Sequence, residues 1–352
     1  MRLTAVQMIG TQRSGSNLLR LMLNQLPQVS APHPPHILER FVPLLPLYGN
    51  LLYTPNFRKL VTDVCQLVAC NPVPWQHAAL DVDRIVQRCE APTIIEIARV
   101  MYEEKARDKN ASIWICKSMS NIHYAQELEA SLQPLYIFLY RDGRDVACSF
   151  KKAVVGEKHI YNIAKQWKEE QDKCIALQQY VGNERCVSVC YEQLIANPEE
   201  ELRKIGAFIG AEYDANCLLY YRSEEAKSTA SSGAMWQNVE RQVLADNYNK
   251  YRKELSAGEI ALFERVAGDT LQQLGYTLDY AGALSQALPL HEIEHYYRLN
   301  KQLKLEARLK QTPVDAAKRK KQEALLNKLK MDMENHYFNR TTGVEKVAAQ
   351  FL

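Results

Sequence analysis

The sequence predicts an α/β fold, a P-loop-like parallel sheet with helices on both faces. Short apolar segments alternate along the chain with longer segments of helical periodicity, which is typical of strands joined by helical crossovers. The expected strands are four apolar runs, at residues 3–9, 112–116, 135–140 and 186–190. Basic residues follow three of these runs closely. Because ligands of open parallel sheets bind beyond the carboxyl ends of the strands, we expect the functional site there.

The composition is that of a soluble globular protein. Of the 352 residues, 47% are hydrophobic and 24% are charged, and the formal net charge is +3. No apolar run reaches about 18 residues, so no membrane span is expected. The first strand starts almost at the N-terminus, which leaves no room for a signal peptide. Nine scattered cysteines without a CxxC pair indicate reduced thiols, so we expect a cytoplasmic protein with no metal site.

We expect one main domain over residues 1–284, with a helical insertion at about residues 37–110. Just before this insertion, residues 27–36 contain four prolines, which exclude a helix and require an extended path. Within the insertion, helical periodicity is broken by proline-containing links. Insertions of this kind are where α/β enzymes often build substrate specificity. A further amphipathic helix is predicted over residues 160–181.

Residues 285–352 form a predicted basic helical extension. Residues 298–330 alone hold eleven Lys or Arg against three Asp or Glu. Two helices are expected, at residues 290–311 and 315–337, each with a thin apolar stripe. The stripes favour packing on the core or on each other, and a homodimer contact is equally open. A nucleic-acid-binding arm is less favoured, because the basic residues lack interleaved aromatic side chains.

The loop after the first strand has the form of an anion-binding loop. It reads Gly-Thr-Gln-Arg-Ser-Gly-Ser-Asn over residues 10–17 and leads into a helical pattern. The first N–H groups of a helix lack intrahelical partners, and the helix dipole favours negative charge beside them. The loop adds a flexible backbone, side-chain donors and a planar cation through Arg13, Ser14, Gly15, Ser16 and Asn17. The alternative is an ordinary strand, turn and capped helix.

The same loop departs from a Walker A motif. Its glycine spacing agrees, but Ser16-Asn17 stands where that motif requires Lys followed by Ser or Thr. The lysine for the β- and γ-phosphates and the hydroxyl for Mg²⁺ are therefore both missing. A P-loop kinase or NTPase remains an alternative, but a weaker one.

A second candidate anion site follows the third apolar run, where the sequence reads Tyr-Arg-Asp-Gly-Arg-Asp-Val-Ala-Cys-Ser. Arg141 comes directly after the expected strand, and Ser149 lies eight residues later in a helical pattern. This spacing directs both side chains toward one anion. The alternative is a structural cluster of ion pairs among the charged residues of the segment: Arg141, Asp142, Arg144 and Asp145.

Together these segments resemble sulfotransferases that use 3′-phosphoadenosine 5′-phosphosulfate (PAPS). The loop at residues 10–17 resembles their 5′-phosphosulfate loop, and Arg141 with Ser149 resembles their 3′-phosphate-binding element. The order of motifs, including Trp-Ile-Cys-Lys at residues 114–117 and Cys-Tyr-Glu-Gln-Leu at residues 190–194, is similar to that of protein-tyrosine sulfotransferases and their bacterial relatives over roughly residues 3–280. The resemblance implies in-line transfer of a sulfuryl group from PAPS to an acceptor hydroxyl, without a metal.

The resemblance also implies roles for single residues. Arg13 and Lys117 would face the transferring sulfuryl group, together with the loop residues Ser14, Gly15, Ser16 and Asn17. Tyr191 would lie near the adenine, and Ser228 matches weakly a serine from a late loop that closes over the nucleotide. The acceptor is a hydroxyl of a small molecule, sugar or peptide, and no nucleic-acid partner is expected.

The catalytic base is where the sequence departs from the tyrosine sulfotransferases, which place a Glu about twenty residues after the loop arginine. Here the segment carries His33 and His36, with no carboxylate until Glu39. A histidine suits the role because its pKa lies near the operating pH. We expect His33 to be the base and His36 to be the second candidate, with His123 a weaker rival. The alternative is that the histidines only pack in the proline-rich turn, and a non-catalytic nucleotide-binding scaffold is a further alternative for the whole chain.

Overall fold

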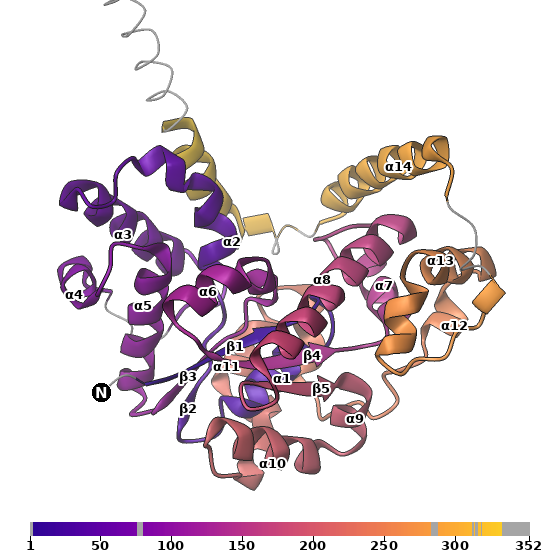
Figure 1. Ribbon diagram of the computed structural model, residues 1–352, viewed down its shortest axis with the longest axis horizontal. Helices are drawn as coiled ribbons and strands as arrows, with labels where there is room; N and C mark the ends of the chain where they lie inside the picture. The colour runs from indigo at the N-terminus through magenta and orange to yellow at the C-terminus, as the bar shows by residue number, and fades with distance from the viewer. Residues whose placement is uncertain are drawn as a thin grey trace, which may run out of the picture.

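A parallel sheet of five strands forms the centre of the protein (Figure 1). The structure, a computed structural model, describes residues 3–75, 80–282 and 288–332, except 312, 314, 315 and 318 and the side chains of 234 and 235. The strands follow the order β2-β3-β1-β4-β5, and every neighbouring pair is parallel. Their bounds are β1 Thr4–Ile9, β2 Val29–Ser30, β3 Ile113–Cys116, β4 Leu135–Tyr140 and β5 Cys186–Cys190. The predicted α/β fold is confirmed.

Four strands match the predicted apolar runs, whereas β2 has no sequence signal of its own. It is only two residues long and lies inside the proline-containing segment, where an extended path was expected. Pairing with β3, through Val29 opposite Ile113 and Ser30 opposite Trp114, defines it as a strand. Tertiary pairing decides the assignment here, because so short a segment shows no periodicity.

The central strands are buried on both faces, with side chains alternating between two layers. On one face, Val6, Ile115 and Leu139 pack into one apolar cluster. That layer contains helices α1 Ser16–Leu23, α9 Tyr191–Ala196, α10 Pro198–Ile209, η3 Ala215–Arg222 and α11 Glu224–Ala230. On the other face, Ile9 and Phe138 pack against helix α8, which spans Ile160–Val181 as predicted.

The region predicted as a helical insertion is helical and lies beside β3, with a core of its own (Figure 1). It contains α2 Ile37–Phe41, η1 Val42–Tyr48, α3 Thr54–Ala69, α4 Val82–Arg88 and α5 Ile94–Asp108. The link between β3 and β4 forms η2 Met119–Tyr124 and α6 Ala125–Ser131. Four further helices follow in the chain: α7 Gly143–Lys152, η4 Ala234–Glu240, α12 Tyr251–Glu254 and α13 Ala257–Gln273.

The C-terminal extension packs back on the same chain in two places. Helix α14, Leu290–Leu309, lies against the start of α8, where His159 stacks on Tyr296 with ring centroids 4.7 Å apart. Residues 319–332 form a second helix whose leucines join the core of the helical insertion. The predicted domain boundary and the end of the second predicted helix lie outside the described residues. None of the described helices combines the length and apolar character that a membrane span needs.

Candidate active site

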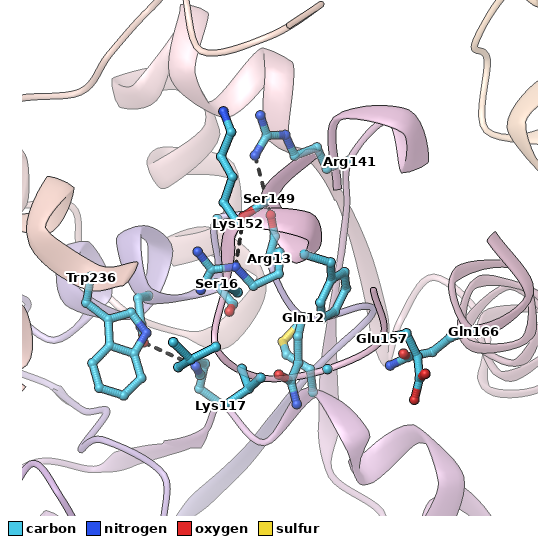
Figure 2. A pocket seen from close by; sticks show the side chains of 18 of the residues that line it. Gln12, Arg13, Ser16, Lys117, Arg141, Ser149, Lys152, Glu157, Gln166 and Trp236 are labelled. Carbon is cyan, nitrogen blue, oxygen red and sulfur yellow. Dashed lines mark hydrogen bonds between the residues drawn. The ribbon is translucent and has the colours of Figure 1, made fainter. Parts of the chain in front are cut away.

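A pocket of about 1210 Å³ lies at the carboxyl edge of the sheet (Figure 2). Each of the five strands leads into a segment that lines it. After β1 comes the loop of residues 10–17, which we call the phosphosulfate loop from here on for its predicted role. The segments after β2, β3, β4 and β5 contribute His33 with His36, Lys117, Arg141 with Ser149, and Tyr191. Residues widely separated in the sequence thus meet because parallel strands end at one edge.

The phosphosulfate loop is held in a tight conformation by close backbone packing. Gly10 has a φ of +131°, and a Cβ there would lie 2.1 Å from the carbonyl oxygen of Leu139. Gly15 has a φ of +87°, and a Cβ there would lie 2.3 Å from the ring of Tyr191. Arg13 also has a positive φ, 73°, which is strained for a residue with a side chain. Only glycine fits the first two positions, so the loop presents its backbone to the pocket.

Helix α1 begins at this loop without a side-chain cap. Its N-cap residue is Gly15, and no side chain accepts from its first N–H groups. Those N–H groups are therefore available to an anion, and the helix dipole adds to the attraction. Ser16 and Asn17 line the pocket. Ser14 does not line it; its side chain is fully buried, and its hydroxyl lacks a hydrogen-bond partner.

The two predicted anion sites touch each other (Figure 2). Arg13 Nε donates a 2.9 Å hydrogen bond to Ser149 Oγ, although 136 residues separate them. The guanidinium of Arg141 lies 4.4 Å from the ring centroid of Tyr191 and donates 2.9 Å to the carbonyl of Asn247. Asn247 in turn donates 2.6 Å to the hydroxyl of Tyr191. Arg141 Nε is buried without a partner, so this guanidinium has donor capacity left for a ligand.

The other arginine of that motif is structural. Arg144 makes two hydrogen bonds to Asp142, at 3.0 and 2.7 Å, and one to Glu264 at 2.5 Å. Its guanidinium also lies 4.1 Å from the ring centroid of Tyr251. The ion-pair cluster that the sequence left as an alternative therefore exists. Arg144 pairs with Asp142 and Glu264, and Arg141 Nη2 lies 3.7 Å from Asp145 Oδ2. Arg141 differs from Arg144 in that it also lines the pocket.

Positive charge accumulates in the pocket beyond what nearby carboxylates balance. Burial lowers the pKa of Arg13 to about 10, and the neighbouring Arg141 contributes. Burial also lowers the pKa of Lys117 to about 7, with further contributions from Arg20 and Arg13. Lys117 Nζ donates 3.1 Å to Asn17 Oδ1, a neutral partner. A bound anion would reverse both shifts, because it stabilises the charged forms.

His33 is held rigidly through its backbone. Its carbonyl accepts from Trp75 Nε1 at 2.7 Å and from Asn71 Nδ2 at 3.1 Å. Its ring packs edge to face on Trp236, with centroids 5.3 Å apart. Burial lowers its pKa well below the usual value, with Arg20 and Lys117 adding to the effect, so the ring is neutral.

The tautomer of His33 follows from its neighbour. Nδ1 lies 3.3 Å from Asn71 Nδ2, whose other contacts are the carbonyls of His33 and Val73, so that nitrogen is the donor. Nδ1 therefore accepts, and the proton of the neutral ring is assigned to Nε2. Nε2 is buried without a partner. In this form His33 offers a hydrogen-bond donor to a ligand.

His36 has the opposite arrangement. Its Nδ1 lies 3.5 Å from Glu39 Oε2, and the same carboxylate oxygen accepts 2.6 Å from Ser120 Oγ. Nδ1 makes no hydrogen bond, but the negative charge of the carboxylate beside it favours a proton there and leaves Nε2 unprotonated. Burial still lowers the pKa of His36 well below its usual value, with Lys117 and Arg40 adding to the effect, because the half-exposed Glu39 does not offset them. His123 lies at the pocket edge, where its Nδ1 is 3.0 Å from Lys173 Nζ.

The structure leaves Ser228 outside the pocket. This residue lies on α11, away from the lining residues, and its carbonyl accepts hydrogen bonds from Ser231 and Ser232. The late segment that does reach Arg141 and Tyr191 supplies Asn247 instead. Sequence reasoning did not identify Asn247, because its contacts are made by a loop with no motif. It also missed Trp236, Arg319 and Gln322, which line the pocket from the late loop and the C-terminal helix.

The structure is that of a P-loop-like α/β protein with two candidate anion sites in one pocket. Residues 6–215 match a model of the sulfotransferase family, so the chain belongs to this family. No curated protein matches the sequence significantly.

Two solved structures share the fold. A sulfotransferase domain from the Synechococcus PCC 7002 olefin synthase is 22% identical, with a TM-score of 0.52, and covers 78% of this chain and 95% of its own. A sulfotransferase domain from the curacin biosynthetic pathway is 18% identical, also with a TM-score of 0.52. The match covers 79% of this chain and 100% of that domain. Among the described residues, no group of three or more His, Cys, Asp or Glu side chains is arranged to hold a metal ion.

Proposed function

We propose that the protein transfers a sulfuryl group from PAPS to an acceptor hydroxyl by in-line displacement. The observation that carries this proposal is the 2.9 Å contact between Arg13 and Ser149, which joins two anion sites in one pocket. PAPS has an anionic group at each end of its sugar and supplies the activated sulfuryl group when bound. The uncapped start of α1 with Arg13 fits the 5′ end, and Arg141 with Ser149 fits the 3′-phosphate.

The orphaned Nε of Arg141 and the close approach of Gly15 to Tyr191 both support this fit. We propose that the ring of Tyr191 packs beside the nucleoside. Asn247 holds this ring in place by donating a hydrogen bond to the hydroxyl of Tyr191. Ser16 and Asn17 add donors at the 5′ end. Ser228 has no part in this proposal, because it lies outside the pocket.

Lys117 and Arg13 would stabilise the charge that develops during transfer. In the proposed step, the acceptor oxygen forms a bond to sulfur while the bond from sulfur to the 5′-phosphate oxygen breaks. The leaving group is adenosine 3′,5′-bisphosphate, and fixed donors aimed at it lower the barrier because they need no reorganisation. An anion beside Lys117 keeps its amine protonated, despite a pKa of about 7 in the free protein.

We assign the role of general base to His36 and that of a hydrogen-bond donor to His33. Glu39 favours a proton on His36 Nδ1, so Nε2 can accept the acceptor's hydroxyl proton. Asn71 favours the proton of His33 on Nε2, from which it can bind an oxygen of the acceptor or sulfuryl group. This reverses the order in which the sequence alone ranked the two histidines.

Binding and turnover test the proposal against its two alternatives. We expect adenosine 3′,5′-bisphosphate to bind in the presence of EDTA, as measured by calorimetry, and ³⁵S to pass from labelled PAPS to an acceptor in a cell extract. A P-loop kinase or NTPase would require Mg²⁺ and hydrolyse ATP instead. A non-catalytic scaffold would bind the nucleotide and transfer no label to any acceptor.

A further inference from the structure

One face of helix α8 lines the pocket with hydrogen-bond acceptors. Asn162, Gln166 and Glu170 recur every four residues, so they lie along one side of the helix, and all three line the pocket. Figure 2 shows Gln166 and Trp236 on opposite sides of the pocket, with Lys117 between them in this view. The pocket, at about 1210 Å³, is larger than the usual site for one small ligand, so this face has room for a second substrate.

Helix α8 is fixed against both segments that we assign to the nucleotide. Buried Gln171 donates 2.8 Å from Nε2 to the hydroxyl of Thr11 in the phosphosulfate loop. The indole of buried Trp167 donates 3.3 Å to the carbonyl of Arg141. The pocket-lining face of α8 is therefore held at a fixed distance from the candidate anion sites, as binding on a rigid element requires.

Glu170 is a buried carboxylate with one oxygen unused. The residue is 5% exposed. Its Oε1 accepts 2.9 Å from Gln166 Nε2, whereas its Oε2 is buried without a hydrogen-bond partner. In the part of the chain that the structure describes, no Lys or Arg forms an ion pair with Glu170, and His123 Nε2 lies 3.7 Å from Oε1. A buried carboxylate is costly unless a cation or hydrogen-bond donors compensate it.

His123 does not supply the missing positive charge. Its Nδ1 lies 3.0 Å from Lys173 Nζ, and an ammonium group can only donate. Nδ1 therefore accepts, and the proton of the neutral ring is assigned to Nε2. Lys173 itself pairs with Glu169 at 2.8 Å. Glu170 is thus without a cationic partner among the described residues and can take one from a ligand.

A second unused acceptor lies two turns earlier on the same face. Asn162 is 7% exposed, and its Oδ1 is buried without a hydrogen-bond partner. Because a helix rises about 1.5 Å per residue, Asn162 lies about 12 Å from Glu170 along the helix axis. Acceptor oxygens spaced along one face suit an elongated ligand that carries several donors. The carboxylate repels the phosphate and sulfuryl groups of a nucleotide, so this face is unsuited to PAPS.

A short helix links this face to the proposed base. At one end of η2, Ser120 Oγ donates 2.6 Å to Glu39, the carboxylate beside His36. At the other end, His123 lies beside Glu170. His36 and Glu170 line the same pocket, so one acceptor can present its hydroxyl to the first and a second group to the other.

We infer that this face of α8 binds a protonated amine of the acceptor at Glu170, so that the protein selects hydroxyl acceptors carrying an ammonium group. The identification of the amine as part of the acceptor rests on the proposed function. The ammonium donates to the unused Oε2 while Gln166 keeps Oε1, and Asn162 accepts from a donor further along the acceptor. Glu170 thereby acts as a specificity residue.

Amine binding can be measured without any turnover. The protein is first saturated with adenosine 3′,5′-bisphosphate. Calorimetry then compares three amines with matches that lack the amine: tyramine with 4-ethylphenol, 6-aminohexan-1-ol with hexan-1-ol, and glucosamine with glucose. We expect at least one amine to bind about tenfold or more tightly than its match, as a hydrogen bond between charged groups gives. This comparison needs no variant, and the absence of any preference in the wild type overturns the inference.

Two matched variants then test the residue. Glu170→Gln keeps the size of the side chain and removes its charge, so the preference for the amine should disappear. Glu169→Gln is the control, because it removes the same charge from an adjacent half-exposed residue that Lys173 already pairs, and it should keep the preference. A preference that survives in Glu170→Gln, or that is lost equally in both variants, overturns the inference.

Turnover separates this inference from the proposed function. With ³⁵S-labelled PAPS, kcat/KM should favour the bound amine over its match by about tenfold or more, and Glu170→Gln should remove this preference. If both members of each pair are used equally, sulfuryl transfer stands and the amine site is wrong. If no acceptor is used but the wild type binds an amine through Glu170, the amine site stands and the proposed transfer is wrong.

Discussion

The two halves of the pocket that we assign to the nucleotide and to the acceptor, called the nucleotide half and the acceptor half, are built in different ways. The nucleotide half consists of the phosphosulfate loop and the segment from Arg141 to Ser149, each of which directly follows a strand of the central sheet. The acceptor half contains the segment from His33 to Arg40, then Trp236, and Arg319 with Gln322. Its parts come from three distant regions and are joined by side-chain packing.

The difference is also one of backbone against side chain. In the nucleotide half, two glycines with positive φ determine the backbone geometry of the loop, one packed against the carbonyl of Leu139 and the other against the ring of Tyr191. In the acceptor half, side chains make the contacts: the ring of Trp236 packs against His33 and Arg319, and the helix of residues 319–332 packs on the helical insertion. We expect substitutions in the first to affect binding or stability, and substitutions in the second to affect turnover and choice of acceptor.

The largest effect is expected where the two halves meet. His36→Ala should lower kcat by about 10²- to 10⁴-fold, the usual contribution of a general base, while the affinity for adenosine 3′,5′-bisphosphate stays within a few-fold of wild type. Initial rates and calorimetry measure the two quantities. His33→Ala is the matched comparison and should cost less, since it removes a donor and not the base. A larger loss in His33→Ala would restore the order expected from the sequence.

The two arginines of one motif provide the next comparison. Arg144→Ala should lower the free energy of unfolding by about 3–5 kcal/mol, because it leaves Asp142 and Glu264 buried and unpaired. Arg141→Ala should weaken nucleotide binding by about 10- to 100-fold through the loss of charge-assisted hydrogen bonds. Urea unfolding and calorimetry separate these outcomes. Unchanged nucleotide binding in Arg141→Ala would remove this residue from the 3′-phosphate site.

Backbone strain in the phosphosulfate loop can be tested with one methyl group. Gly15→Ala places a Cβ against Tyr191 at a φ of +87° and should lower the free energy of unfolding by about 1–2 kcal/mol or more. Gly258→Ala is the control, because a Cβ there meets nothing within 4 Å and the residue is helical. The control should be neutral or slightly stabilising. Equal stability of the two variants would show that close packing does not restrict the loop.

The smallest effect is expected in the pH dependence of nucleotide binding. Lys117 has a pKa of about 7 in the free protein, lowered by burial and by Arg20 and Arg13, with Asn17 as its hydrogen-bond partner. An anion bound beside it raises that pKa, so binding at pH 8 should take up nearly one proton and the affinity should fall as the pH rises above about 7. Calorimetry in buffers of different ionisation enthalpy measures the uptake. Lys117→Met should abolish it; uptake that persists in this variant would assign the proton to another group.

Much of the fold could be read from local patterns. The four longer strands and helix α8 have strong apolar periodicity, and the structure confirms them. Strand β2 was not predicted, because its two residues show no strand pattern of their own and only pairing with β3 defines it as a strand. For the basic extension the sequence predicted helices and apolar stripes. It could not indicate which surface covers each stripe, since periodicity identifies the buried face of a helix and not its partner.

By itself the sequence determined the class of fold and identified two segments that line one pocket, the loop of residues 10–17 and the segment from Arg141 to Ser149. Their signals are contiguous, because a strand, a tight loop and a helix start lie within about twenty residues and the physics of an anion at a helix N-terminus is local. Only the tertiary structure decided the strand order, the different partners of Arg141 and Arg144, and the contacts of Trp236 with His33 and Arg319. The strand order and the contacts of Trp236 depend on packing between segments that are far apart in the sequence, and no local pattern encodes which buried faces meet.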